Sequence, residues 1–425
     1  MEAIIISTTL LKEQDLSFAL AERQVLRALA GQVAELAARP VEQAKCRLWL
    51  EHNALYPTRP VVFCDPETSW NEIIPDKTLF CTNRIARGWE FLLRREIFWG
   101  AQMQDDRVVM PVFDVPHVHD EPDWGATERV IETAGEDRTA YTWEAPVHSE
   151  ADWDQVHAPL LRLDFAASDR LVDLASNLFG DLLQVRLKTQ WWWTLGMTWT
   201  LIKLRGLEQF MFDLVERPAF VHRMLSTLRA GTLAMVDALE HAGLLSLNND
   251  GTYVGSGGYG WTSALPAAGF DGRVRACDLW GFAESQETVG VSPRMFEQFI
   301  FPYQLPLLEK FGLNCYGCCE PLDQRWHIVQ RIPRLRRVSV SPWSDRRRMA
   351  ENLGDRYIFS LKPNPADLAT DTFDENRIRA ELRRDLELTR DCRVELILKD
   401  VTTMRHDPRR ALRWVEIALQ EAHNL

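Results

Sequence analysis

The chain has no long hydrophobic run and no excess of positive charge, and each absence argues against a class of function. No stretch approaches the about 20 consecutive apolar residues of a membrane-spanning helix, so no membrane contact is expected. The N-terminal sequence MEAIIISTTLLKEQD lacks the basic start and cleavage site of a secretory signal, which favours a cytoplasmic protein. With 49 Lys and Arg against 61 Asp and Glu, the net charge is -12. This balance argues against a nucleic-acid partner, because phosphate binding needs basic side chains.

Repeats, low-complexity tracts and a disulfide framework are also missing. The eight cysteines are not spaced as a disulfide framework for a chain of 425 residues, and three of them lie together in NCYGCCE. Tryptophan, in contrast, is abundant, with 16 residues, four of them in WWWTLGMTW. Core packing is the commoner role of a single tryptophan, but a cluster this dense favours a pocket wall for at least one.

Hydrophobic periodicity divides the chain into two parts. Residues 1–104 are expected to form a mainly helical extension, with helical patterns over 10–56 and 79–103 and a short apolar run at 60–64. Residues 105–425 are expected to form the main domain. It opens with a buried strand over 108–116 and a long polar loop over 117–150.

After residue 215, short apolar segments alternate with helical ones, which predicts parallel strands joined by right-handed crossovers. The predicted strands are 244–250, 278–285, 313–320, 336–342, 356–363 and 393–400. The predicted helices are 218–242, 293–311, 322–332, 374–391 and 408–422. These six units, with at least two earlier strands, indicate an α/β fold of the closed (β/α)8 TIM barrel type.

An open doubly wound sheet is the alternative fold. The sequence GSGGYG at 255–260 has the Gly-x-Gly-x-x-Gly spacing of a dinucleotide-binding loop and follows a predicted strand. The next residues, WTSALPAAG, do not begin a helix, so no helix N-terminus is available for a pyrophosphate. The spacing is therefore interpreted as a chance match.

Ionisable and nucleophilic residues follow most of the predicted strands, where the active site of a barrel lies. They are Asp250, Glu284, Cys318, Cys319, Glu320, Ser341, Lys362, Lys399 and Asp400. Each alone is commonly a solvated loop position or a helix cap. Together they predict an active site on one rim. The candidates for catalysis are Glu284, Glu320, Lys362, Lys399 and Asp400.

Cys318 is the candidate metal ligand, because a thiolate is a soft ligand that suits zinc. Side chains alternate along a strand, so Cys318 and Cys319 are expected to point to opposite faces. For the same reason Cys315, three residues earlier, is expected to point away from Cys318. A metal site with one cysteine ligand is therefore favoured over a site of four thiolates. The alternative is that these cysteines are small buried residues with no role in metal binding.

From about residue 105 onward the chain resembles the uroporphyrinogen decarboxylase superfamily. The resemblance lies in LWGFAESQETVGVSPRMFEQFIFPYQLPLLEKFG, NCYGCCEPLDQRW, LRRVSVSPWSD, SLKPNP and ELILKDVTT. It implies a (β/α)8 barrel with one of two activities. One is cofactor-independent decarboxylation of porphyrinogen acetates, and the other is corrinoid-dependent methyl transfer, usually with zinc. The Arg-Gln-Ala-Gly-Arg-Tyr run of the decarboxylases is absent, and a polycarboxylate needs several Arg, so the methyltransferase branch is favoured.

The methyltransferase branch carries a zinc-binding His-x-Cys-Gly strand end and a further Cys near the last strand. By this resemblance Cys318 takes the place of the first Cys, and Tyr316 stands where the His is expected. No Cys occurs at 399–402, so the chain looks like a divergent subgroup. A zinc ion on Cys318 would need oxygen ligands, Glu320 first, or Glu284, Asp250 or Asp400.

The resemblance therefore implies a methyltransferase that demethylates a small methoxy compound. The methyl group would pass to a separate corrinoid protein that brings cobalamin, since the chain shows no corrinoid-binding domain. Substrate contacts are expected from Asp250, Tyr253, Trp192, Trp280 and Tyr316, and an acid from Lys399 with Asp400 or from Glu284 with Glu320. A decarboxylase of the uroporphyrinogen decarboxylase type, acting on a smaller carboxylate, and a non-catalytic binding protein are the alternatives.

Overall fold

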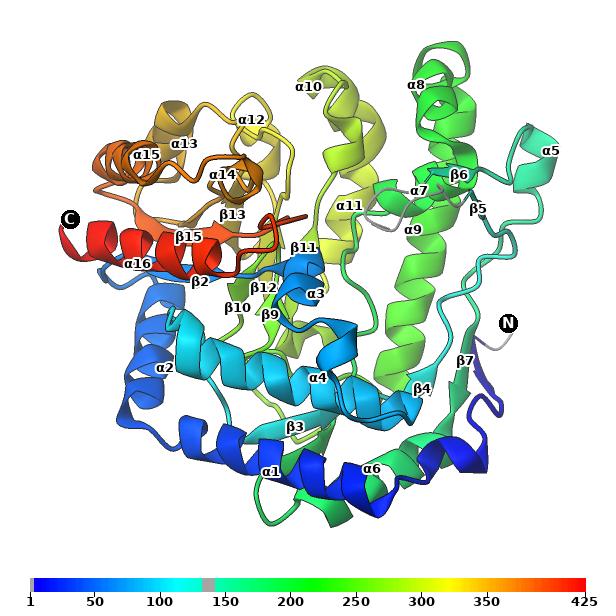
Figure 1. Cartoon of the computed structure of the whole chain (residues 1–425). Helices are drawn as coiled ribbons and strands as arrows, with labels where there is room; N and C mark the ends of the chain where they lie inside the picture. The colour runs from blue at the N-terminus through cyan, green and yellow to red at the C-terminus, as the bar shows by residue number, and fades with distance from the viewer. Residues whose placement is uncertain (1–3, 132–141) are drawn as a thin grey trace.

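A six-stranded parallel sheet forms the centre of the molecule (Figure 1). The computed structural model describes residues 4–131 and 142–425, so part of the polar loop expected at 117–150 lies outside the described residues. The strands run in the order β11 (Trp280–Ala283), β12 (Leu313–Tyr316), β13 (Leu335–Val340), β14 (Ile358–Leu361), β15 (Arg393–Leu398) and β2 (Val61–Cys64). Five of the six strands predicted after residue 215 are confirmed, and the fold is α/β.

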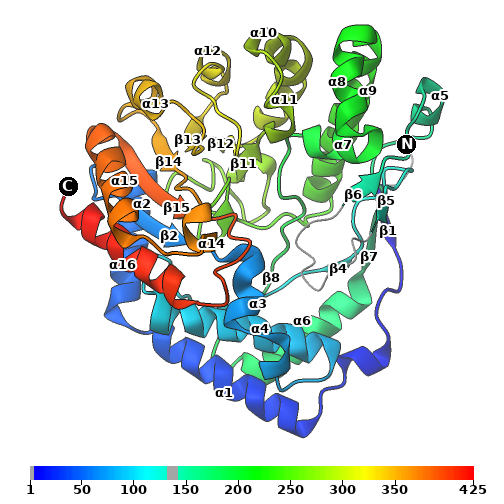
Figure 2. The ribbon, with the colours of Figure 1, turned by 45° about the horizontal axis from the view of Figure 1, so that its top comes forward.

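Helices cover the outer side of this sheet, as Figure 2 shows. The predicted helix over 293–311 is α10 (Pro293–Met295), the π-helix Phe296–Ile300 and α11 (Phe301–Leu308) in succession. Further along are α12 (Trp326–Val329), α13 (Arg346–Leu353), α14 (Ala366–Ala369), α15 (Glu375–Leu388) and α16 (Arg409–His423). Asp345 and Asp374 cap α13 and α15 by accepting backbone N–H groups, which explains where these helices begin.

The segment 244–250 was predicted to be a strand, and this prediction is wrong. It follows α9 (Pro218–His241) and lies beside β11 without a backbone ladder. The Asn248 side chain instead bonds the backbone of Trp280, accepting from its N–H at 2.9 Å and donating to its carbonyl at 3.1 Å. Polar side chains of this kind compete with ladder bonds. Within residues 4–131 and 142–425 the pairing of this sheet therefore stops at six strands, and the closed (β/α)8 barrel stays a prediction.

A second, smaller layer lies beside the central sheet. β3 (Val112–Val115) and β8 (Gln184–Leu187) form a parallel pair, and β8 continues into the tryptophan run. Three helices pack around this pair: α1 (Leu20–Ala37), α4 (Arg84–Phe98) and α6 (Phe165–Phe179). Trp89, Phe113 and Phe179 meet there in a hydrophobic core of its own. The strand predicted over 108–116 is thus present, but it pairs outside the main sheet.

The remaining elements are short or peripheral. They are the three-stranded sheet β1 (Ile5–Ser7), β7 (Leu161–Asp164) and β4 (Val118–His119), the pair β5 (Arg129–Ile131) and β6 (Thr142–Glu144), α2 (Pro40–Asn53), α3 (Trp70–Ile73), α5 (Glu150–Trp153), α7 (Thr198–Arg205) and α8 (Leu207–Glu216). Short strands therefore occur where a loop was predicted over 117–150. No helix in the described part of the chain is long and apolar enough to cross a bilayer.

The first 104 residues, predicted as a mainly helical extension, also contribute to the main sheet. β2 pairs with β15 along its length, and its four residues are fully buried. Two residues at the end of α2 also reach the sheet: His52 lies 3.3 Å from Glu395, and Asn53 accepts a hydrogen bond from Arg337 at 2.7 Å. The predicted domain boundary near residue 104 stays a prediction.

A glycine-rich hairpin packs against the inner face of the sheet. β9 (Tyr253–Val254) and β10 (Gly258–Tyr259) are antiparallel and are seen near the centre of Figure 1. A Cβ on Gly257 would lie 2.4 Å from Ile397, and one on Gly258 would lie 2.3 Å from Arg337. The GSGGYG sequence is thus a tight hairpin that only glycine allows to approach the sheet.

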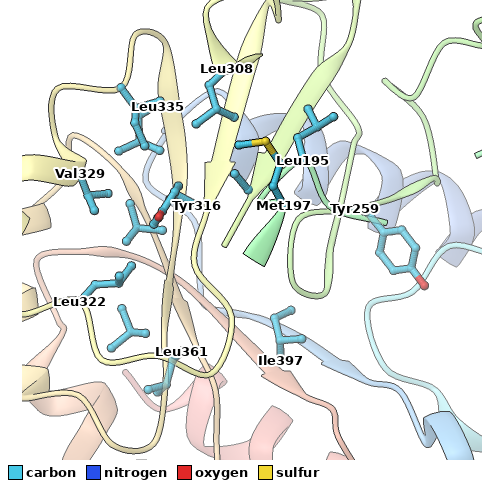
Figure 3. Packing of buried hydrophobic residues seen from close by; sticks show 14 of the residues in the cluster. Leu195, Met197, Tyr259, Leu308, Tyr316, Leu322, Val329, Leu335, Leu361 and Ile397 are labelled. Carbon is cyan, nitrogen blue, oxygen red and sulfur yellow. The ribbon is translucent and has the colours of Figure 1, made fainter. Parts of the chain in front are cut away.

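The main hydrophobic core fills the space between the sheet and the surrounding helices. Figure 3 shows part of it, where Tyr316 of β12 and Leu335 of β13 lie near Leu308 and Val329 of the helical layer. This core holds the strands in register. It thereby holds the residues at their carboxyl ends in a defined arrangement.

Candidate functional site

Two adjacent thiols lie at the carboxyl end of β12. The sulfur atoms of Cys318 and Cys319 are 3.6 Å apart, and we call these residues the thiol pair. They were predicted to face opposite sides of a strand, which is wrong. β12 ends at Tyr316, and Gly317 has a φ of +92°, so strand alternation does not extend to the thiols. Cys318 is buried, whereas Cys319 is half-buried.

Polar groups from the hairpin and from the end of β15 surround the thiol pair. The Ser256 hydroxyl donates to the Cys318 sulfur at 3.2 Å, and the Cys319 thiol lies 3.7 Å from a carboxylate oxygen of Asp400. Lys399 donates to the other oxygen of Asp400 at 2.8 Å. The structure therefore brings the predicted residues Cys318, Lys399 and Asp400 together.

The charges of this group favour a thiolate at Cys318. Contact with the Cys319 sulfur lowers the pKa of Cys318, and the Lys399 ammonium lowers it further against burial. The pKa of Cys319 is raised by the same sulfur contact and by burial. Burial opposes the charge of Lys399, but Cys318, Glu67 and Asp400 outweigh it and raise the pKa of Lys399. The Cys318 thiol therefore loses its proton more easily than the Cys319 thiol does.

Glu284 and Glu320 lie behind the thiol pair and are fully buried. Both oxygens of Glu320 accept backbone N–H groups, from Ser285 at 2.8 Å and from Cys318 at 2.9 Å. Burial raises the pKa of Glu320. Burial, with Glu287 and Glu320, also raises the pKa of Glu284. Both carboxyl groups therefore favour the protonated state more than free glutamates do.

The residues at this rim do not fit a zinc ion. In the part of the chain that the structure describes, no three His, Cys, Asp or Glu side chains gather as metal ligands. Glu320, the expected second ligand, already uses both oxygens on backbone N–H groups. Tyr316 cannot replace a histidine ligand, because its hydroxyl is buried and donates to Gln304 at 2.7 Å. The Lys399 cation beside Cys318 also disfavours a second cation there.

Lys362, at the end of β14, belongs to a separate buried network. Its ammonium donates to the Ser360 hydroxyl at 2.5 Å, and Ser360 donates to Glu395 at 2.5 Å. Glu395 also pairs with Arg337 at 2.9 Å. Burial lowers the pKa of Lys362 to about 8. The lysine is therefore held by the protein, and its predicted catalytic role stays a prediction.

An aromatic cavity of about 210 Å³ lies between the hairpin, the segment 244–250 and the end of β8. Three residues predicted to contact substrate line it, namely Trp192, Tyr253 and Trp280. Val254 and Gly255 of the hairpin also face this cavity, while the next residue, Ser256, bonds Cys318. One side of the hairpin thus lies on the cavity and the other on the thiol pair.

The charged groups at the cavity are paired with one another. Lys188 lines the cavity and donates to both oxygens of Asp250 at 2.9 Å. Arg186 donates to Asp250 at 2.9 Å and to the two oxygens of Asp114 at 2.6 and 2.8 Å. Burial lowers the pKa of Lys188. Burial opposes the charge of Asp250, but Lys188 outweighs it and holds the pKa of Asp250 below its ordinary value.

The predicted site residues therefore fall into three places. The thiols, Lys399 and Asp400 lie on the rim with the two buried glutamates behind them, and Trp192, Tyr253, Trp280 and Asp250 lie at the cavity. Tyr316 reaches neither, because its hydroxyl is held by Gln304 inside the core. Lys188, Arg186 and Asp114 were not predicted as site residues from the sequence. Arg186 and Lys188 alternate in QVRLK just before the tryptophan run, which places both on one face of a strand.

Comparison with solved structures finds remote likeness, without a match at the level of sequence families. No protein-family model and no curated protein sequence matches the chain. Among solved structures, a methyltransferase from Methanosarcina mazei is similar to it, with a TM-score of 0.48 and 10% sequence identity. The match covers 88% of this chain and 97% of the other. A likeness at this level carries no inference about activity.

Proposed function

We propose that the protein is a methyltransferase that removes the methyl group from a small, neutral methoxylated aromatic compound. The acceptor in this proposal is a separate corrinoid protein, as the sequence resemblance implies. The observation that carries the substrate class is the aromatic cavity, whose charges are already paired. Trp192 and Trp280 line this cavity, and aromatic walls suit an aromatic guest.

The paired charges at the cavity favour a neutral guest over a carboxylate. Asp250 and Asp114 balance the charges of Lys188 and Arg186, so two cations face two anions. A carboxylate substrate would have to compete with these aspartates for the same donors. This pairing gives the decarboxylase alternative no support from the cavity.

Lys188 is the proton donor in this proposal. A reduced corrinoid on the partner protein would supply the nucleophile and accept the methyl group as the methyl carbon–oxygen bond breaks. The electron pair stays on the phenolic oxygen. The Lys188 ammonium then gives that oxygen a proton, and burial suits it to this role because it lowers the Lys188 pKa. Asp250 holds the ammonium in place through both of its oxygens.

The test is phenol formation from a panel of methoxyarenes in the presence of a reduced corrinoid protein. Lys188→Met should lower kcat by about 10²-fold or more, because a general acid contributes on that order. Lys310→Met is the control, since Lys310 pairs with Asp237 away from the cavity. Absence of phenol from every substrate would contradict the proposal. Carbon dioxide release from arene carboxylates would support a decarboxylase, and ligand binding without turnover would support a binding protein.

A further inference from the structure

The thiol pair has a geometry that the proposed methyl transfer does not use. Its sulfur atoms are in contact at 3.6 Å, and the neighbouring Asp400 side chain is 46% exposed. The other half-buried cysteines, Cys46, Cys277 and Cys392, have no comparable sulfur contact among the described residues. The contact is therefore particular to Cys318 and Cys319.

Neighbouring groups give the two thiols different roles. Cys318 receives the Ser256 hydroxyl at 3.2 Å and lies near the Lys399 ammonium, both of which stabilise a negatively charged sulfur. Cys319 lies 3.7 Å from Asp400, which can accept its proton. Asp400 has a φ of +60°, in the left-handed region that Asp adopts more readily than most residues other than glycine. Cys318 is thus arranged as a nucleophile and Cys319 as a second thiol within reach.

We propose that the thiol pair is a modification site for hydroperoxides, at which Cys318 is oxidised and Cys319 closes a disulfide with it. This reactivity does not depend on the proposed methyl transfer. Low-pKa thiols beside a resolving cysteine are typical of reversible thiol oxidation.

The chemistry needs only the peroxide and a later thiol reductant. The Cys318 thiolate attacks one peroxide oxygen, the O–O bond breaks, and the leaving oxygen takes a proton to give water or an alcohol. Cys318 is now a sulfenic acid. The Cys319 sulfur, after losing its proton toward Asp400, attacks the Cys318 sulfur. The S–O bond breaks, the S–S bond forms, and hydroxide leaves with a proton as water.

The disulfide formed in this way should be easy to reduce. Adjacent Cα atoms are about 3.8 Å apart across a trans peptide, below the about 4.4 to 6.8 Å usual for disulfides. Such strain favours reduction by small thiols. The modification is therefore expected to be reversible.

The test is mass spectrometry of the intact, reduced protein after treatment with one equivalent of hydrogen peroxide. We expect the peptide that carries 318–319 to lose two hydrogens and to recover them with dithiothreitol. Cys319→Ser should stop at a sulfenic acid that dimedone labels on Cys318. Cys318→Ser should remove the fast reaction. Lys399→Met should slow the oxidation of Cys318 about tenfold, because the Cys318 thiolate loses the stabilising ammonium group.

Cys46 and Cys392 serve as internal controls, because burial raises the pKa of each thiol. Equal oxidation of these cysteines and Cys318, or oxidation of wild-type Cys318 to sulfinic acid without a disulfide, would overturn the proposal. The wild-type mass shift needs no variant, so it decides the question even if a substitution impairs folding.

Discussion

Burial and a neighbouring lysine act in opposite directions on the pKa of Glu67, a single carboxyl group at the rim. Glu67 follows β2, and its carboxylate accepts the backbone N–H of Asp400 at 2.8 Å and lies 3.6 Å from the Lys399 ammonium. Burial nevertheless raises the pKa of Glu67 to about 7, despite this lysine. The protein therefore holds a carboxyl that titrates close to neutral pH beside the thiol pair.

Glu67→Gln should change the pH dependence of stability. The folded-state pKa lies above the ordinary value of 4.5, so the contribution of protonated Glu67 is complete below pH 4.5. It is lost as the pH rises through about 7. Glutamine stays neutral, so the variant should gain about 1 to 2 kcal/mol relative to wild type between pH 5 and pH 8. Urea unfolding at several pH values measures this. Glu216→Gln, at an exposed position of α8, is the control, and parallel curves for Glu67→Gln and wild type would contradict the prediction.

At the scale of elements, the glycine-rich hairpin is the feature on which both candidate sites depend. It separates the aromatic cavity from the thiol pair, and Ser256 in its turn bonds Cys318. Its close approach to the sheet depends on residues without a Cβ. The hairpin and β15 therefore pack closely, since a Cβ on Gly257 would lie 2.4 Å from Ile397 of β15.

Gly257→Ala should disrupt this packing. Gly257 has a φ of +115°, and its added Cβ would lie 2.4 Å from the Ile397 side chain. We expect a loss of more than about 2 kcal/mol of unfolding free energy, from backbone strain and overpacking together. Gly31→Ala is the matched control, because no atom lies within 4 Å of a Cβ at that position of α1. That change should stabilise the protein by about 0.5 to 1 kcal/mol, as alanine is the better helix former. Denaturant unfolding of both variants tests this, and similar shifts would contradict it.

At the scale of the whole molecule, residues from the first quarter of the chain complete the interior. β2 forms the last strand of the six-stranded sheet, and Asn53 donates to the carbonyls of Tyr259 at 2.9 Å and Trp261 at 2.7 Å. His52 and Asn53 are also partners of the buried pair formed by Glu395 and Arg337. These contacts join parts of the chain that are far apart in sequence.

A fragment of residues 105–425 should therefore fail to fold into the native arrangement. Without β2 and α2, the β15 edge would be exposed, and the buried pair of Arg337 and Glu395 would lose its contacts with Asn53 and His52, which is destabilising. We expect no cooperative urea transition and little near-ultraviolet circular dichroism from the fragment, while the full chain shows both. A fragment that unfolds cooperatively would show that residues 1–104 are a separate extension.

Much of the α/β architecture was predictable from the sequence, because it depends on local patterns. Apolar runs such as those at 313–316 and 393–398 have the composition of buried strands, and the regular helices α9, α15 and α16 have clear starts. The segment 244–250 carries the same apolar pattern. Its failure to form a strand depends on Asn248 bonding Trp280, a contact between residues 32 apart.

The residues of the candidate site were also predictable from the sequence, whereas the contacts between them were not. Local patterns in the chain identify the reactive residues, since strand ends place Cys318, Lys399 and Asp400 on one edge of a parallel sheet. The contacts among these residues come from the folded structure. The turn at Gly317 ends the strand before the two thiols, and the hairpin places the Ser256 hydroxyl beside the Cys318 sulfur. Lys188 donates to Asp250, which lies 62 residues further along the chain. These outcomes depend on backbone turns and long-range packing, which no local pattern in the chain encodes.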